Sequence, residues 1–137
     1  MTVSMCLSRT RKSATALLLL TWLAVPTGAQ APDAATHKAW MNDASDAQED
    51  YRFALSDKDQ KAAVDALAKL DALMAKTEDY WTAKKVADGV KLAKDAHTLA
   101  SAALASARKA DMTAAGQNFD KLGATCNSCH ELHLEKR

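Results

Sequence analysis

Apolar residues recur every three or four positions from about residue 33 onward, a spacing that places them on one face of a helix. The first predicted helix runs from Asp33 or Thr36 to about Leu55. Its apolar stripe consists of Trp40, Ala44, Ala47, Tyr51 and Ala54. A second helix is expected from Ser56 or Asp57 through about Lys76. The stripe of that helix consists of Ala63, Ala66, Leu67, Leu70, Leu73 and Met74.

Two further helices follow, and Ser, Thr or Asp residues are the candidate caps throughout. The third opens at Thr77 or Asp79, and its stripe is Val86, Val90, Ala93, His97, Ala100, Leu104 and Ala107. The fourth is capped by Asp111, and one face carries Ala115, Phe119, Leu122, Cys126, Cys129 and His133. Short connections make successive helices antiparallel neighbours, so the predicted fold is all-α, an up-down-up-down four-helix bundle.

The first 29 residues have the order of a secretory signal peptide. Arg9, Arg11 and Lys12 precede an apolar run over residues 16–25, and small residues then lead to a cut after Ala29. The bundle domain is therefore expected at residues 30–137, in the periplasm, with no membrane attachment after cleavage. An uncleaved anchor is the alternative, but the run has about ten residues and a spanning helix needs about 20.

Composition agrees with an all-helical domain, because the 137 residues include 30 alanines and no isoleucine. Loss of residues 1–29 removes three basic residues and no acidic one, so 18 Lys and Arg become 15 against 17 Asp and Glu. A formal charge of −2 gives no electrostatic footprint for nucleic acid. No pair of residues suggests a nucleophile with its base, so we do not expect an enzyme. An alanine-rich core is thin, and a large group could usefully fill it.

The one specific chemical motif is Cys126-Asn-Ser-Cys129-His130, which has the spacing of a c-type haem attachment site. Two thiols three residues apart lie on one side of a helix and can form thioethers to the two vinyl groups of one porphyrin. His130 then follows as the proximal iron ligand. The motif predicts one covalent haem c.

Two other sites could use the same residues. A redox-active Cys-x-x-Cys disulfide normally belongs to a βαβ unit, and the chain shows no strands to supply one. A zinc ion could take Cys126, Cys129, His130 and His133. Cys129 and His130 are adjacent and point about 100° apart on a helix, which is awkward for one tetrahedral ion.

A leader, a helical bundle and a Cys-x-x-Cys-His motif close to the C-terminus resemble the cytochrome c′ family, the class II c-type cytochromes, and its low-spin methionine-ligated relatives. The resemblance is residue-specific at Gly123, Cys126, Cys129 and His130. It implies that the two cysteines attach the haem, that His130 is the proximal ligand, and that Gly123 lets the porphyrin approach the helix. It also suggests redox partner proteins and a homodimer through the first two helices.

The chain departs from the family after the motif. His133 and Leu134 stand where many members have an aromatic residue and then an arginine, although Arg137 could substitute from one turn further on. The family arginine is tied to the handling of diatomic gases. The expected function is one-electron transfer, and the alternatives are a five-coordinate protein that binds or scavenges nitric oxide, or a haem-free helical metal-binding or interaction module.

Met41 is the expected sixth iron ligand. It lies about eight residues into the first helix and His130 about seven from the chain end, so both stand about 10–12 Å from the same end of the bundle. The methionine-ligated relatives carry their ligand at this place. His37, one turn earlier, and an open site remain alternatives. His97 is expected to be a hydrogen-bonded core histidine, and Tyr80 and Trp81 are expected to begin the third helix beside the haem.

Overall fold

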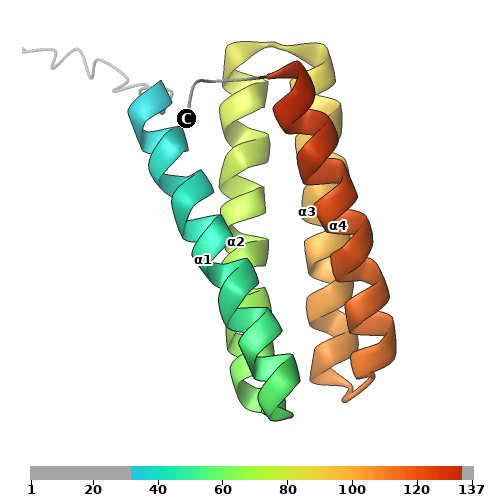
Figure 1. Cartoon of the computed structure of the whole chain (residues 1–137). Helices are drawn as coiled ribbons and strands as arrows, with labels where there is room; N and C mark the ends of the chain where they lie inside the picture. The colour runs from blue at the N-terminus through green and yellow to red at the C-terminus, as the bar shows by residue number, and fades with distance from the viewer. Residues whose placement is uncertain (1–31, 134–137) are drawn as a thin grey trace, which may run out of the picture.

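Four helices run alternately up and down the long axis of the molecule, and short turns connect them (Figure 1). The computed structural model describes residues 32–133, so the expected signal peptide at 1–29 lies outside the described residues. The helices are α1 (Ala34–Asp57), α2 (Gln60–Lys84), α3 (Ala87–Arg108) and α4 (Met112–Leu132). The prediction of an all-α antiparallel four-helix bundle is confirmed. Within the described residues, none of these helices has the length and apolarity needed to span a membrane.

Aspartate side chains cap three of the four helices. Asp33 accepts a hydrogen bond from the Thr36 backbone N–H at 2.7 Å. Asp111 accepts one from Ala114 at 2.9 Å, as expected. The second helix begins later than predicted, because α1 continues through Asp57 and Asp59 is the cap of α2, bound to the Ala62 N–H at 2.9 Å. Each cap satisfies an N–H that has no partner within its helix.

The predicted start of the third helix at Thr77 or Asp79 is wrong. Thr77 is buried inside α2, where its hydroxyl donates to the Leu73 carbonyl at 2.9 Å and so cannot cap a new helix. Helix α2 ends instead at Lys85, which adopts a left-handed conformation with φ 58° and ψ 34°. Val86, predicted to lie on the helical stripe, is the N-cap of α3 and supplies no side-chain cap. Tyr80 and Trp81 consequently belong to the last turn and a half of α2.

The interior is built mainly from small side chains. Eighteen buried residues form the main core cluster, and ten of them are alanine. The larger buried members are Tyr51, Leu67, Leu70, Leu73, Met74, Leu104, Phe119 and Leu122. Alanine buries little apolar area, so the hydrophobic contribution of this core per residue is small. The predicted stripes of α1 and α2 lie in the core, except that Trp40 is only half-buried.

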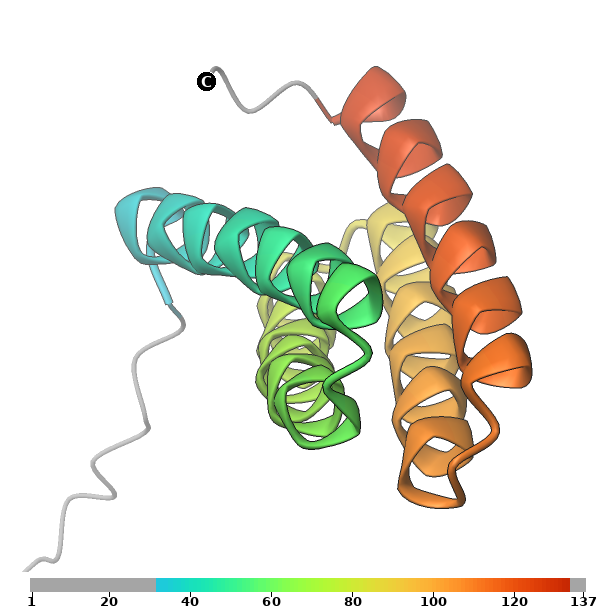
Figure 2. The same ribbon diagram turned by 60° about the horizontal axis from the view of Figure 1, so that its bottom comes forward.

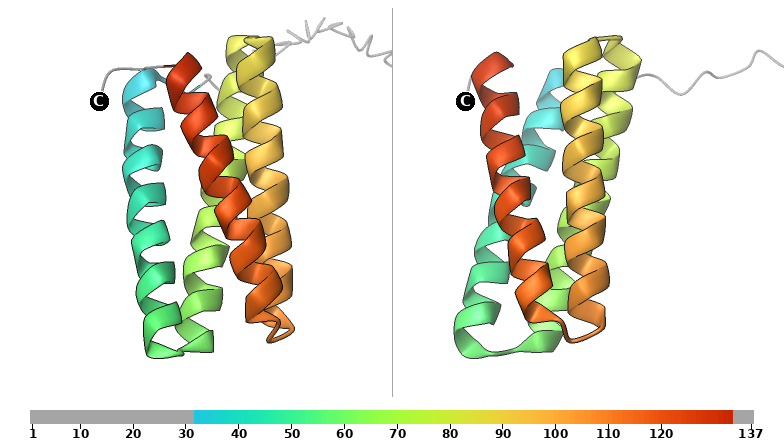
Figure 3. Two further views of the ribbon diagram at one scale, coloured as in Figure 1. Left: turned by 45° about the vertical axis from the view of Figure 1, so that its right-hand side comes forward. Right: turned by 90° about the vertical axis from the view of Figure 1, so that its right-hand side faces the viewer.

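The helices do not close evenly around this core. Helix α2 packs closely against α1 and α3, and α3 packs against α4, whereas α1 and α4 have no comparable backbone approach. Figures 1 and 2 show that α1 and α4 diverge toward the end at which α1 begins and α4 finishes. Figure 3 shows the same two ends at one pole of the bundle.

His97 lies at the seam of α2 and α3 and not in the core. Its Nδ1 is 2.9 Å from Glu78 Oε2, and its Nε2 is 3.7 Å from Asp71 Oδ1. Ser101 donates a hydrogen bond to the same Asp71 carboxylate. The expectation of a hydrogen-bonded histidine is therefore confirmed, but the side chain is 33% exposed and the network joins two helix surfaces.

Gly89 in α3 allows Trp81 of α2 to pack against the helix backbone. A Cβ at position 89 would lie 2.7 Å from two indole carbons, Cδ2 and Cε3. Trp81 is buried beside Tyr80 and Ala93 in a second, smaller hydrophobic cluster at this end of the bundle. The glycine is thus required by the position of the indole.

Replacing Gly89 with Ala should destabilise the protein. Overpacking costs about 1–3 kcal/mol, and the better helix propensity of alanine returns about 1 kcal/mol. Gly116→Ala is the matched control, because nothing lies within 4 Å of a Cβ there and only the propensity gain remains. Thermal melts followed by indole fluorescence measure both effects. Equal or higher stability of Gly89→Ala with an unchanged emission spectrum would contradict this account.

Candidate functional site

The Cys-x-x-Cys-His motif occupies the last two turns of α4. Cys126 and Cys129 are free and half-buried, and Cys126 packs against the main core cluster. His130 is exposed, and its imidazole makes no hydrogen bond, ion pair or ring contact with any residue from 32 to 133. The motif therefore presents two inward thiols and one imidazole that no protein group engages.

Two glycines of α4 near the motif have open space before them. Gly116, Gly123 and His130 are spaced by seven residues, so they share a face two helical turns apart from one to the next. A Cβ added at Gly123 would meet nothing within 4 Å, although the residue is only half-exposed. No protein neighbour explains a glycine at this position, and a mid-helix glycine costs about 1 kcal/mol relative to alanine.

Burial keeps the thiols protonated. Loss of hydration raises the pKa of Cys126 from its ordinary value of 9.0 to about 11, and the neighbouring Cys129 adds to the effect. Burial also raises the pKa of Cys129, with a further contribution from the Asp88 carboxylate. Both cysteines are thus less nucleophilic than exposed ones, because the thiolate is the reactive form.

Four rings from three elements gather at the same end of the bundle; we call them the aromatic end cluster. His37 stacks flat on Tyr80 with 4.1 Å between ring centroids, and Trp81 meets both edge-on at 5.6 and 5.2 Å. On the other side, Trp81 lies 4.6 Å from the His133 ring. The cluster joins the start of α1 to the end of α4 through α2.

His133 has a role that the sequence did not reveal. Its Nε2 lies 3.3 Å from Asp88 Oδ2 in the first turn of α3, and its ring contacts Trp81. These contacts hold the end of α4 against α2 and α3. Leu134 and Arg137, considered above for gas handling, lie outside the described residues. In the sequence, only the position of His133 on the apolar stripe of α4 indicated that it faces the other helices.

The two candidate sixth ligands are placed differently. Met41 is half-buried on α1 and packs against the main core cluster. His37 is 6% exposed and engaged with Tyr80 and Trp81. Both lie at the pole that holds the motif, as the height argument predicted.

Buried side-chain atoms without a hydrogen-bond partner within residues 32–133 include the indole Nε1 of Trp81, the hydroxyl of Tyr51 and Nε2 of His133, which lies 3.3 Å from Asp88 without a hydrogen bond. Tyr51 lies on α1 and packs on Phe119 of α4 at 4.5 Å, two turns before Cys126. Buried polar groups are normally hydrogen-bonded, so each exception calls for an explanation such as a missing bound group.

The alternative uses of the motif find little support in its surroundings. Within residues 32–133, no three His, Cys, Asp or Glu side chains come together as a metal-binding group, which counts against the arrangement Cys126, Cys129, His130 and His133. No strand is present in the same range to form the βαβ context of a redox disulfide. The site offers free thiols, open space at Gly123 and hydrogen-bond donors without acceptors. These features suit an apolar planar group that carries polar atoms at its edge.

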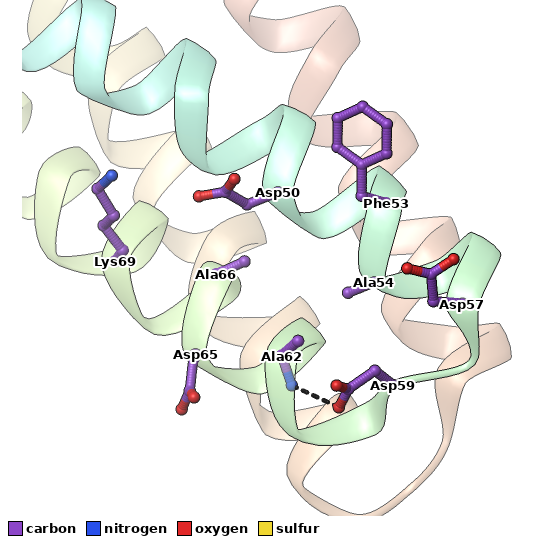
Figure 4. Close-up of a pocket in the computed structure, with 9 residues that line it drawn as sticks. All are labelled: Asp50, Phe53, Ala54, Asp57, Asp59, Ala62, Asp65, Ala66 and Lys69. Carbon is purple, nitrogen blue, oxygen red and sulfur yellow. Dashed lines mark hydrogen bonds between the residues drawn. The ribbon is translucent and has the colours of Figure 1, made fainter.

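A groove at the opposite pole offers no comparable chemistry. It lies between the second half of α1 and the first half of α2 (Figure 4). Its lining residues are Asp50, Phe53, Ala54, Asp57, Asp59, Ala62, Asp65, Ala66 and Lys69. Asp59 is occupied as the cap of α2, as the hydrogen bond to Ala62 in Figure 4 shows. Asp65 pairs with Lys61 at 2.6 Å, and the exposed Asp50 and Asp57 identify no ligand.

Comparisons of the chain with protein-family models, with curated proteins and with solved structures found no match. Any function must therefore be argued from the residues and their arrangement.

The raised pKa predicts slow alkylation of Cys126 in the folded, haem-free protein. A pKa of about 11 in place of 9.0 lowers the thiolate fraction about 100-fold at pH 8. The rate with iodoacetamide should rise about tenfold per pH unit up to about pH 11, whereas in urea it should level off near pH 9. Tandem mass spectrometry locates the label at Cys126 or Cys129. Equal rates at pH 8 in buffer and in urea would show that the thiol is not buried.

Proposed function

We propose that this protein is a periplasmic c-type cytochrome that carries one covalent haem and transfers single electrons between redox proteins. The observation that carries the proposal is the open face of α4. Gly123 has empty space before it, His130 continues the same face without a partner, and two free thiols lie beside them. The resemblance to the cytochrome c′ family rests on these same residues.

Different residues of the site would hold different parts of the haem. Cys126 and Cys129 would hold the porphyrin through thioethers, and His130 would bind the iron. Gly123 would let the flat ring lie against the helix without a side chain between them. A bound haem would add a large apolar surface to a core in which ten of eighteen buried residues are alanine. The iron supplies the one-electron chemistry when bound, and axial ligation and burial tune its potential.

Met41 is the proposed sixth ligand. Its thioether lies at the pole of His130 and is half-buried against the core, while His37 is already stacked on Tyr80. A thioether ligand favours a low-spin iron with a raised potential, which suits electron transfer. An open sixth position would favour binding of nitric oxide instead.

Haem attachment is tested by a stain of the denatured protein after export in a host that matures c-type cytochromes. The wild type should retain haem, and the double variant Cys126→Ser, Cys129→Ser should not. Gly123→Ala should stabilise the haem-free bundle by about 0.5–1 kcal/mol, because it removes a helix-interior glycine, but it should lower haem incorporation.

The control is Gly116→Ala, which is equally open and lies one heptad earlier, about 10 Å from Gly123 along the helix. It should stabilise the haem-free protein by the same amount and leave haem incorporation unchanged. Absence of covalent haem in the wild type would refute the proposal. Equal incorporation by the two alanine variants would remove Gly123 from the site.

Met41→Ala should convert a low-spin ferric spectrum into a high-spin one and let the ferrous protein bind carbon monoxide readily, because it empties the sixth position. Optical spectra of both redox states measure this. Met112→Ala is the control, since Met112 is also half-buried against the core but lies at the other pole. If the unmodified protein is already high-spin and binds carbon monoxide, Met41 is not a ligand and gas binding takes precedence over electron transfer.

A further inference from the structure

The indole of Trp81 is a buried hydrogen-bond donor without an acceptor. The residue is 4% exposed, and its Nε1 has no partner within residues 32–133. An indole N–H donates a hydrogen bond and accepts none. Trp81 therefore needs a neighbouring acceptor atom, such as an oxygen. Buried tryptophans usually find an acceptor for this group, and an unmet one is a signal of something absent.

The ring cannot turn to find an acceptor elsewhere. His37 and Tyr80 meet it edge-on at 5.6 and 5.2 Å, and His133 lies 4.6 Å away on α4. Gly89 closes the remaining side, because the indole carbons occupy the place of its missing Cβ. Residues of α1, α2 and α3 and the C-cap of α4 thus surround the indole and fix the direction of its N–H. A donor held in this way by the folded chain is pre-organised for an acceptor.

Trp81 stands next to the end of α4. It contacts His133, which is three residues and about one helical turn beyond His130. The charged groups around this ring are few: Asp88 lies 3.3 Å from His133, and the Lys84 ammonium lies 5.3 Å from the Tyr80 ring. A positive charge at this pole suits an anionic partner, and the Asp88 carboxylate already accepts a hydrogen bond from the Gly89 backbone N–H at 2.9 Å.

We propose that Trp81 Nε1–H donates a hydrogen bond to a propionate carboxylate of the bound haem; this inference rests on the proposed function. The pyrrole nitrogens of a haem bind its iron, so the two carboxylates are the acceptors that its periphery offers. A hydrogen bond to an ionised acceptor is stronger than one between neutral groups. Trp81 is then a positioning residue that fixes one edge of the porphyrin relative to α2, while the thioethers fix the other to α4.

The test uses the full, haem-loaded protein and its variant Trp81→Phe, which keeps an aromatic ring and removes only the donor. Resonance Raman spectroscopy of the haem reports the propionate bending band. This band should move to lower frequency in Trp81→Phe, because a hydrogen bond restrains the bend. Trp40→Phe is the control, since Trp40 also packs against the clusters but its indole nitrogen is not an orphaned donor. It should leave the band in place.

A second measurement does not depend on the Trp81 variant. In haem-loaded Trp40→Phe, Trp81 is the one indole within residues 32–133, and its ultraviolet Raman band should lie in the hydrogen-bonded position. An unbonded Trp81 indole, or an unmoved propionate band in a haem-loaded variant, overturns the inference and leaves the cytochrome proposal standing. A bonded indole with an unmoved propionate band assigns the acceptor to a buried water and likewise overturns it. A wild type without covalent haem in the stain overturns both.

Discussion

Small side chains determine how this bundle is built. Alanine methyl groups let neighbouring helices approach closely, but each buries little apolar area, so most of the interior lacks a large group that could bind all four helices together. Packing therefore follows the chain, α1 on α2, α2 on α3 and α3 on α4, and the remaining pair of helices diverges at one pole. Four rings lie at that pole, where His37, Tyr80, Trp81 and His133 bridge the ends that the small residues leave apart.

Local sequence signals predict much of the fold. The predictions that were wrong concern positions where such signals are absent. Asp33 and Asp111 cap helices because a carboxylate beside unpaired N–H groups is favourable in any context, so they were predictable. The turn between α2 and α3 was not. Lys85 and Val86 resemble neither a left-handed terminator nor an N-cap, and Thr77 resembles a cap but bonds back into its own helix. What places the turn is tertiary packing: Trp81 must lie on the bare backbone of Gly89.

The candidate site likewise has one part that local sequence predicts and another that depends on tertiary contacts. Helical periodicity alone predicts that Cys129 and His130 both neighbour Cys126 on α4, because they follow it by three and four residues. The surroundings depend on contacts between residues far apart in sequence, such as His133 with Asp88 and His37 with Tyr80, and no local pattern signals them. His97 illustrates the difference: its place on the stripe suggested the core, but Asp71 and Glu78 across the seam hold it at the surface.

The chemistry of the thiols connects the site to the order of folding. Cys126 has its pKa raised to about 11 because it is packed against the core, so the folded, haem-free bundle presents a weakly reactive thiol in a crowded place. Attachment of a porphyrin to that thiol is therefore easier before α4 closes onto the core than after. A helix with Gly123 and His130 on one face could receive the proposed haem while still undocked, since nothing lies within 4 Å of a Cβ at Gly123. Closure of α1 and of the aromatic end cluster would then follow around that group, and it would fill the thin core as the last step.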